Sequence, residues 1–202
     1  MAAATLAVVA TTLLLARHGE TDWNREQRWQ GHADPPLTET GRGQARELAR
    51  LLAGVPLDAV YSSDLRRARE TAVAVAEAHG LGVVVTPRLR EIDVGEWSGL
   101  TTAEIEARFP AGWARHGAGG DGWEHGETHA AMSARVVGAV SELVQARPGG
   151  HVLFVLHGGV IRALLAHAAG IELGEYRRTQ RGPVNGGVAR IAIGAAGFTR
   201  ID

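Results

Sequence analysis

The sequence contains no cysteine and no lysine, and each of its 21 basic residues is an arginine. Without lysine, the chain can neither build a P-loop nor form the Schiff base of a pyridoxal enzyme. Without cysteine, it cannot act as a thiolate phosphatase, form disulfides or bind a metal through thiolates. These two absences exclude several widespread chemistries before any motif is considered.

A strong charge of either sign is also missing. The formal net charge is −1, from 21 basic and 22 acidic residues that are mixed along the chain. Nucleic acids and anionic membranes attract proteins through broad basic surfaces, so this balance predicts neither partner and favours a small molecule. The 202 residues, 45% of them hydrophobic, suit a single domain over residues 1–202 and leave open whether it forms a homodimer.

The first sixteen residues carry no charge at all. They lack the basic n-region of a secretory signal and are too short to cross a bilayer. They also run directly into the segment to which we assign the chemistry below. We therefore interpret residues 12–16 as a buried strand preceded by a loose extension, and we expect a cytoplasmic protein.

Apolar runs and amphipathic patterns alternate along the chain. Four runs are typical of buried strands: 12–16, 57–61, 83–86 and 151–156. Helical patterns occupy 38–53, 64–79 and 127–147, and a turn at Gly158-Gly159 leads to a further helix over 160–169 and a late strand over 188–193. This order predicts an α/β fold, with a mostly parallel sheet covered by helices on both faces.

Residues 98–126 interrupt this order with aromatic residues, histidines and several glycines. We interpret the stretch as a lid-like excursion above the sheet. Two roles remain open for it. It is either a long surface loop whose Trp113 and Trp123 anchor it to the core, or a cap that contacts substrate.

Polar residues follow each of the four strand-like runs. In chain order they are Arg17-His18-Gly19-Glu20-Thr21, Ser62-Ser63-Asp64-Leu65-Arg66-Arg67, Arg90-Glu91-Ile92-Asp93 and His157-Gly158-Gly159. In open α/β sheets the active crevice lies at the carboxyl ends of the strands. The order therefore predicts two histidines, several arginines and a carboxylate at one edge of the sheet.

These residue types suit the transfer of a phosphoryl group. Arginine binds phosphate oxygens through paired hydrogen bonds, a neutral imidazole attacks phosphorus directly, and a carboxylic acid protonates the leaving oxygen. Glycine after each histidine lets backbone N–H groups approach the phosphate. A helix that begins after Gly158 would direct its positive end there as well.

Spacing alone leaves several assignments open. Three arginines fit the second phosphate-binding position and three carboxylates fit the acid: Arg66, Arg67 and Arg69, and Glu91, Asp93 and Glu96. The remaining histidines show no metal-ligand spacing and are interpreted as structural or surface residues: His32, His79, His116, His125, His129, His151 and His167. The sequence therefore predicts no metal site and no cofactor.

Short motifs surround these candidates, and they follow one another in a defined order over most of the chain. The first is Leu15-Ala16-Arg17-His18-Gly19-Glu20-Thr21 with Asn24. It is followed by Gln30-Gly31, Leu37-Thr38 with Gly41 and Gln44-Ala45, Ser62-Ser63-Asp64-Leu65 with Arg67-Ala68 and Thr71-Ala72, Leu89-Arg90-Glu91 with Gly95, Gly99, and His157-Gly158. An Arg-His-Gly triplet alone is weak, but the ordered set closely resembles the histidine phosphatase superfamily, also called the phosphoglycerate mutase-like family.

This resemblance implies a three-layer α/β/α fold with a mixed, largely parallel sheet. It also implies that His18 is the nucleophile and Glu91 the proton donor. Three residues would hold the phosphoryl oxygens: Arg17, Arg67 and His157. Further substrate contacts are implied for Asn24, Thr21, Gln30, Gly158 and Glu127. Asn185 receives no catalytic role, because Gly187 replaces the serine that the family usually has two positions after this asparagine.

The segment after Glu91 resembles the phosphatase branch of the family. The mutases resemble one another in a Tyr-Gly segment and a lysine there, whereas this chain reads Gly95-Glu96-Trp97-Ser98-Gly99-Leu100 and has no lysine. We predict a metal-independent phosphatase that hydrolyses small phosphate monoesters through a phosphohistidine on His18. The alternatives are a cofactor-dependent phosphoglycerate mutase and a non-catalytic phospho-ligand binding module.

Overall fold

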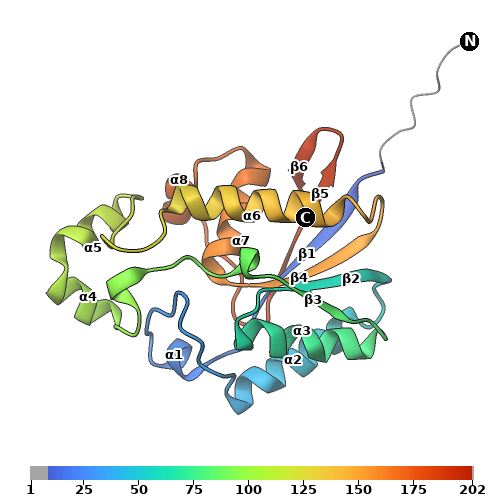
Figure 1. The fold of residues 1–202 in the computed structure, drawn as a ribbon, viewed down its shortest axis with the longest axis horizontal. Coiled ribbons are helices and arrows are strands. Elements are labelled where there is room, and N and C mark those ends of the chain that lie inside the picture. The colour runs from blue at the N-terminus through green and yellow to red at the C-terminus, as the bar shows by residue number, and fades with distance from the viewer. Residues whose placement is uncertain (1–8, 202) are drawn as a thin grey trace, which may run out of the picture.

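A computed structural model describes residues 9–201, so most of the predicted loose extension lies outside the described residues. Its centre is a six-stranded sheet with the strand order β3-β2-β4-β1-β5-β6 (Figure 1). The strands are β1 (Thr11–Arg17), β2 (Leu57–Ser62), β3 (Val83–Val85), β4 (His151–Leu156), β5 (Val188–Gly194) and β6 (Gly197–Arg200). The first four pair in parallel, whereas β5 and β6 are antiparallel, which confirms the mixed and mostly parallel sheet.

The two central strands, β1 and β4, are buried on both faces. In β1, Leu13 and Leu15 join the core on one side, and Leu14 and Ala16 join the core on the other. Successive side chains of a strand point to opposite faces, so a strand covered on both sides reads as a continuous apolar run. This is why the sequence pattern located these strands accurately.

Helices form a layer on each side of the sheet (Figure 1). Helices α2 (Glu39–Leu52) and α3 (Arg66–Ala78) cover one face, and α6 (His129–Val144) and α7 (Gly158–Ala169) cover the other. The remaining short elements are α1 (Asp22–Arg25), η1 (Pro87–Leu89), η2 (Gly95–Trp97), α4 (Thr102–Arg108), α5 (Pro110–Gly117) and α8 (Leu173–Thr179). The three-layer prediction is therefore confirmed.

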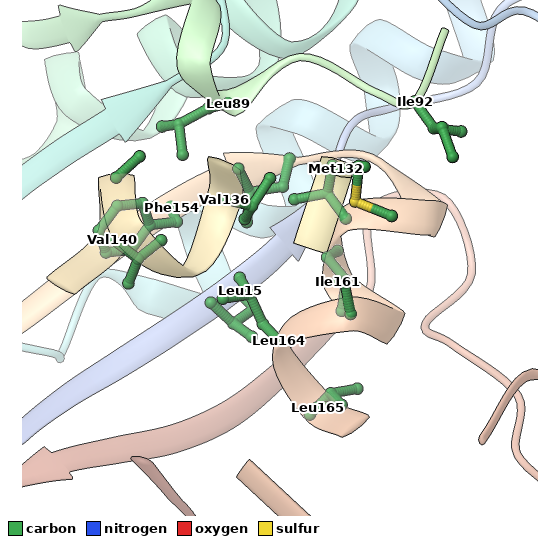
Figure 2. Close-up of a cluster of buried hydrophobic side chains, with 14 of the residues drawn as sticks. Leu15, Leu89, Ile92, Met132, Val136, Val140, Phe154, Ile161, Leu164 and Leu165 are labelled. Atoms are coloured by element: carbon green, nitrogen blue, oxygen red, sulfur yellow. The ribbon is translucent and has the colours of Figure 1, made fainter. Parts of the chain in front are cut away.

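Helix α6 supplies much of the larger core. Figure 2 shows Met132, Val136 and Val140 along one side of this helix, near Leu15 and Phe154 of the sheet. Their spacing of four residues places them on one helix face. Burying an aliphatic side chain of this size contributes about 1.5–3 kcal/mol relative to exposing it. The stripe thus fixes α6 against the sheet.

Two of the differences from the sequence prediction concern residues 158–159 and 98–126. The glycine pair predicted as a turn before residue 160 is instead the start of α7, with His157 as its N-cap. Residues 98–126, predicted as a lid-like excursion, contain α4 and α5, which lie together beyond one end of the sheet (Figure 1). Periodicity missed these two helices because they have only 7 and 8 residues, which is about two turns.

The excursion is fastened to the core by close packing around Trp97. Side chains at Gly112 and Gly122 would collide with their neighbours, since a Cβ atom at Gly122 would lie 2.1 Å from the Trp97 indole. Trp123 is also buried. Over residues 9–201, none of the helices is long and apolar enough to cross a membrane.

Candidate active site

The carboxyl ends of β1, β2 and β4 lie at one edge of the sheet and open on a cavity of about 290 Å³. The cavity lining includes most of the residues that the sequence singled out: Arg17, His18, Asn24, Gln30, Arg67, Glu91 and Gly158. They come from five separate segments of the chain. The structure therefore brings together two arginines, a histidine and a carboxylate, as parallel pairing of the strands requires.

His18 lies at the end of β1 and is almost completely buried. Its Nδ1 lies 2.7 Å from the carbonyl oxygen of Gly19. Because a carbonyl oxygen only accepts hydrogen bonds, Nδ1 carries the proton and Nε2 keeps its lone pair. Burial, followed by the nearby Arg67 charge, holds the pKa of His18 well below its usual value. The imidazole is therefore neutral and has a free nucleophilic nitrogen.

The turn that carries His18 is fixed from two sides. The Gly19 N–H donates to the Thr71 hydroxyl at 3.0 Å, and the Asn185 side-chain amide donates to the His18 carbonyl oxygen at 3.0 Å. The Gly186 N–H also donates to the Arg17 carbonyl oxygen at 3.0 Å. The sequence prediction assigns Asn185 no catalytic role; its side-chain amide and the Gly186 N–H hold the turn in place through these backbone contacts.

Arg67 is the arginine of α3 that points into the protein, with 1% of its surface exposed, whereas Arg66 and Arg69 are exposed. Its guanidinium donates to the carbonyl oxygens of Ala33 at 2.6 Å and Gly31 at 3.0 Å. These neutral acceptors orient the group without cancelling its charge, and burial lowers the pKa of Arg67 to about 10. The structure thus separates three arginines that periodicity could not distinguish.

Arg17 is the second guanidinium at this end of the cavity. It donates to the Pro183 carbonyl oxygen at 3.3 Å, and its buried Nε has no hydrogen-bond partner within residues 9–201. Its guanidinium packs beside the first residue of α7, since a Cβ atom at Gly158 would make an ordinary contact, at 3.6 Å from Cζ of Arg17. An unpaired buried donor of this kind suits an anionic ligand.

His157 lies next to His18, with ring centroids 5.2 Å apart; it is fully buried and is not among the residues that line the cavity. Its Nε2 lies 2.7 Å from the Ser63 hydroxyl, while its Nδ1 has no partner in the described part of the chain. Burial, with Arg67 as the next cause, holds the pKa of His157 well below its usual value. If the Ser63 hydroxyl donates to Nε2, Nδ1 carries the proton and offers a donor to a ligand.

Glu91 faces the start of α7. Its Oε2 accepts a hydrogen bond from the Gly159 N–H at 3.0 Å, and its Oε1 accepts one from the Ile92 N–H at 3.0 Å. A Cβ atom at Gly159 would lie 2.4 Å from Oε1, so this contact requires glycine. The other two candidate acids are engaged elsewhere, in backbone hydrogen bonds within the loops: Asp93 with Gly95, and Glu96 with Glu124 and His125.

The segment around Glu91 is held rigidly. Leu89 and Ile92 are buried in the larger core, and Figure 2 shows both beside α6. Arg90 forms a two-point ion pair with Asp64, which ties the segment to the end of β2. The anchoring fixes the position of Glu91 relative to His18, which proton transfer requires.

The other predicted contact residues occupy different places. Asn24 and Gln30 line the cavity, but Thr21 does not, because its buried hydroxyl caps α1 and bonds to Asn24. Glu127 is paired with Arg135 and is absent from the lining. Arg135 also donates to the Arg90 carbonyl oxygen at 3.1 Å, so this pair supports the Glu91 segment instead.

The far side of the cavity is built by residues to which the sequence assigns no definite role. We call them the outer wall: Trp29, His116, Trp123, His129 and Arg177. The four rings among them contact one another, with centroids 5.0 Å apart for the pair Trp29 and His116. His116 and His129 are thus cavity residues, which corrects their interpretation as purely structural or surface histidines. The excursion over residues 98–126 both anchors to the core and reaches the cavity.

Another cavity residue, Arg162, also escaped the sequence analysis. It lies on α7 four residues after Gly158, on the same helix face, so helical spacing offered a signal for it. Within residues 9–201, no group of three or more histidine or carboxylate side chains is arranged to hold a metal ion.

Comparison with known proteins agrees with this arrangement. Residues 13–200 match the family model of the histidine phosphatase superfamily, branch 1. The chain is 42% identical over 174 residues to glucosyl-3-phosphoglycerate phosphatase from Mycobacterium tuberculosis, covering 78% of this chain and 74% of that protein. It is 37% identical over 169 residues to the probable phosphoglycerate mutase GpmB from Cronobacter sakazakii, covering 81% and 77%.

A solved structure supports the same grouping. Mycobacterial glucosyl-3-phosphoglycerate phosphatase complexed with VO3 superimposes with a TM-score of 0.81 at 36% identity, over 89% of this chain and 90% of that chain. The strand order, the cavity and these matches lead to one conclusion. The chain belongs to the histidine phosphatase superfamily, branch 1.

Proposed function

We propose that the protein is a phosphatase that hydrolyses small phosphate monoesters through a phosphohistidine on His18. The observation that carries the proposal is the state of His18. Its Nδ1 is committed to the Gly19 carbonyl oxygen and its neutral ring keeps Nε2 free, in a cavity that also holds two buried arginines. A neutral imidazole in this setting is poised to attack phosphorus.

In the first step, Nε2 of His18 forms a bond to phosphorus while the bond between phosphorus and the ester oxygen breaks. Glu91, in its acid form, gives its proton to the departing oxygen, which leaves as an alcohol. Arg17, Arg67 and His157 donate to the three equatorial oxygens, where negative charge spreads in the transition state. Each donor of this kind contributes about 10² to 10³ in rate in other enzymes.

In the second step, the Glu91 carboxylate takes a proton from a water molecule. The oxygen of that water forms a bond to phosphorus, and the bond between phosphorus and Nε2 of His18 breaks. Inorganic phosphate is released and Glu91 is again an acid, so the cycle closes without a change of oxidation state. We propose that the protein donors suffice and that the reaction needs no metal ion.

The other predicted contacts enter the proposal through their positions. Asn24, Gln30 and Gly158 line the cavity and are proposed to contact the phosphate or the leaving alcohol. Thr21 acts through Asn24, whose side chain it orients. The cytoplasmic location, the single domain and homodimer formation stay predictions from the sequence.

The mutase alternative is less supported. A mutase would return the phosphoryl group to the substrate, and its segment after the catalytic glutamate differs from the Gly95–Leu100 sequence. Here Gly95 adopts a φ of 50° and Trp97 is fully buried, so this segment packs against the core. With 3-phosphoglycerate and 2,3-bisphosphoglycerate supplied together, we expect far more free phosphate than 2-phosphoglycerate.

Trapping of the intermediate tests the proposal. Protein mixed with a radiolabelled phosphate ester and quenched within the first turnover should carry label that is stable in base and labile in acid. The label should map to His18, and substitution of the exposed His125 by alanine should not remove it. Turnover without any labelled protein, or turnover that EDTA abolishes and Mg²⁺ or Zn²⁺ restores, would point to another mechanism.

A further inference from the structure

The cavity holds more positive charge than one phosphate group needs. Of the described residues that line it, five are arginines and only one, Glu91, is acidic. Arg28 is already paired with two glutamates, and two others are the proposed phosphate ligands. This leaves two arginines whose charge the proposed reaction does not use: Arg162 and Arg177.

Arg162 is the more available of the two for binding a ligand, because no group among the described residues binds its guanidinium. Within residues 9–201 it forms neither a hydrogen bond nor an ion pair, although it is half-buried and lines the cavity. The loop at Gly182 crosses its stem, since a Cβ atom there would lie 3.3 Å from Cγ of Arg162. The side chain is therefore confined at its stem while its charged end is unpaired.

Arg177, on α8, also lines the cavity and is held by neutral groups. It donates to the Gly119 carbonyl oxygen at 3.2 Å and lies 2.8 Å from the His116 ring nitrogens. Burial and then the charge of Arg162 lower the pKa of Arg177, so the two guanidinium groups repel each other. Two carboxylates raise the pKa of Arg177 without forming an ion pair with it: Asp121 and Glu172.

We propose that Arg162, supported by Arg177, forms a second anion site, so that the preferred substrates carry a carboxylate or a further phosphate on the leaving alcohol. This inference rests on the phosphatase function proposed above. An anion between the two guanidinium groups would relieve their repulsion, and charged hydrogen bonds in a partly dry cavity are strong.

The position of Arg162 limits how far apart the two anions are. It follows Gly158 by one turn of α7, and Gly158 is the residue against which Arg17 packs. One helical turn rises by about 5.4 Å. A second anion on the same small ester is therefore within reach of Arg162, whether it is a carboxylate near the ester oxygen or a phosphate at the other end of a sugar.

Matched pairs of esters test the proposal. Glycerol 3-phosphate and 3-phosphoglycerate share one skeleton and differ in a hydroxymethyl group against a carboxylate. Fructose 6-phosphate and fructose 1,6-bisphosphate provide the phosphate arm. We expect kcat/KM to favour the second member of at least one pair by about 10-fold or more, and Arg162→Gln to remove most of that preference, mainly by raising KM.

Arg181→Gln is the matched control. Arg181 is exposed, lies outside the cavity lining and loses the same unit of charge. The Arg181→Gln variant should keep the wild-type preference for the more charged ester, which separates a local contact from the effect of net charge. If Arg162→Gln loses the kcat/KM preference only within the glycerol pair, the site binds a carboxylate. If the preference is lost only within the fructose pair, the site binds a phosphate.

Two outcomes overturn the second anion site alone. One is hydrolysis of all four esters by the wild type without preference for the extra charge. The other is an equal loss of kcat/KM on both members of each pair in Arg162→Gln. If instead no ester yields phosphohistidine on the wild-type protein, the phosphatase proposal fails as well, and the trapping experiment reports that separately.

Discussion

The two sides of the cavity are built in different ways. On the inner side, His18, Arg67 and His157 are almost completely buried and held by hydrogen bonds to backbone or to Ser63. On the outer wall, Trp29 and His116 are half-buried and held mainly by ring contacts and by one arginine. Hydrogen bonds thus fix the inner side, whereas the outer wall combines ring packing with a few hydrogen bonds, such as that from Trp123 Nε1 to the Glu127 carbonyl oxygen at 2.9 Å.

This difference separates chemistry from recognition. A nucleophile and an acid must keep a fixed distance and tautomer, because a displacement of about 1 Å can cost about 10² in rate. Ring contacts tolerate small shifts, so a wall made of them can accommodate different leaving alcohols. We therefore expect substitutions on the inner side to affect the rate of the chemical step, and substitutions on the outer wall to affect substrate choice and stability.

The largest expected effect is that of His18→Ala. Loss of the nucleophile should lower turnover of p-nitrophenyl phosphate by about 10⁵-fold or more, because no neighbouring side chain can reach phosphorus in its place. For comparison, His116→Gln on the outer wall should lower it by about 10-fold at most. Similar losses in both variants would abolish the distinction between the two sides.

Glu91→Gln should have the next largest effect, and the effect should depend on the leaving group. For glycerol phosphate the departing alkoxide is strongly basic, so losing the acid should cost about 10² to 10⁴ in rate. The nitrophenolate ion is already stable near neutral pH, so p-nitrophenyl phosphate should lose far less. First-turnover rates in a rapid-quench experiment make the comparison, because later steps then do not contribute.

Equal losses on the two esters would deny Glu91 the role of acid. Asp93→Asn and Glu96→Gln serve as controls, since both carboxylates bond to loop backbone away from the cavity. A selective loss in either of these variants would transfer the role to that residue.

Gly159→Ala should have a smaller effect of the same kind. The new methyl group would lie 2.4 Å from Oε1 of Glu91, so the carboxylate must move. We expect the rate on glycerol phosphate to fall by about 10-fold to 10²-fold. Gly138→Ala in α6 is the matched control, because its methyl group would make only an ordinary contact, at 3.8 Å from Arg88. Full activity of Gly159→Ala would show that Glu91 tolerates displacement.

The smallest effect concerns stability in acid and belongs to the outer wall. Burial, aided by Arg177, lowers the pKa of His116 to about 3, against 6.5 for the ordinary side chain. Between these values the unfolded state binds a proton that the folded state does not, so this group costs stability progressively as the pH falls below about 6.5. Unfolding at pH 5 then takes up close to one proton at His116.

His116→Gln should remove that dependence. The difference in urea midpoint between pH 7.5 and pH 5.0 should be smaller in the variant than in the wild type, while the exposed His125→Gln should resemble the wild type. Three other histidines have lowered pKa values and contribute in the same direction: His18, His129 and His157. An unchanged pH dependence in His116→Gln would mean that this ring is protonated in the folded protein.

Much of the fold could be predicted from the sequence, because its central elements are buried. Strand β4 matches its predicted bounds at 151–156, and α2 begins just after Thr38, whose hydroxyl accepts a hydrogen bond from the Gly41 N–H. Shorter elements could not be predicted in this way. Helices α4, α5 and α8 each have 8 residues or fewer, too short for a hydrophobic period to establish itself.

The inner side of the cavity was also accessible from the sequence. Arg17, His18, Glu91 and His157 each follow a strand-like run, and parallel strands place their carboxyl ends at one edge. The order of motifs then distinguished Arg67 from Arg66 and Arg69. These residues could be found because the chain positions each of them locally, through a strand end or the first turn of a helix.

The outer wall and the lowered pKa of His18 were decided by tertiary structure alone. The outer wall comes from three distant segments of the chain, which contain Trp29, His116 with Trp123, and Arg177, and no local pattern indicates that these segments meet. The contact between Asn185 and the His18 carbonyl oxygen likewise spans 167 positions. Local sequence determines which groups stand at the ends of strands, but their protonation and the cavity they face depend on burial and distant neighbours, which only the folded chain supplies.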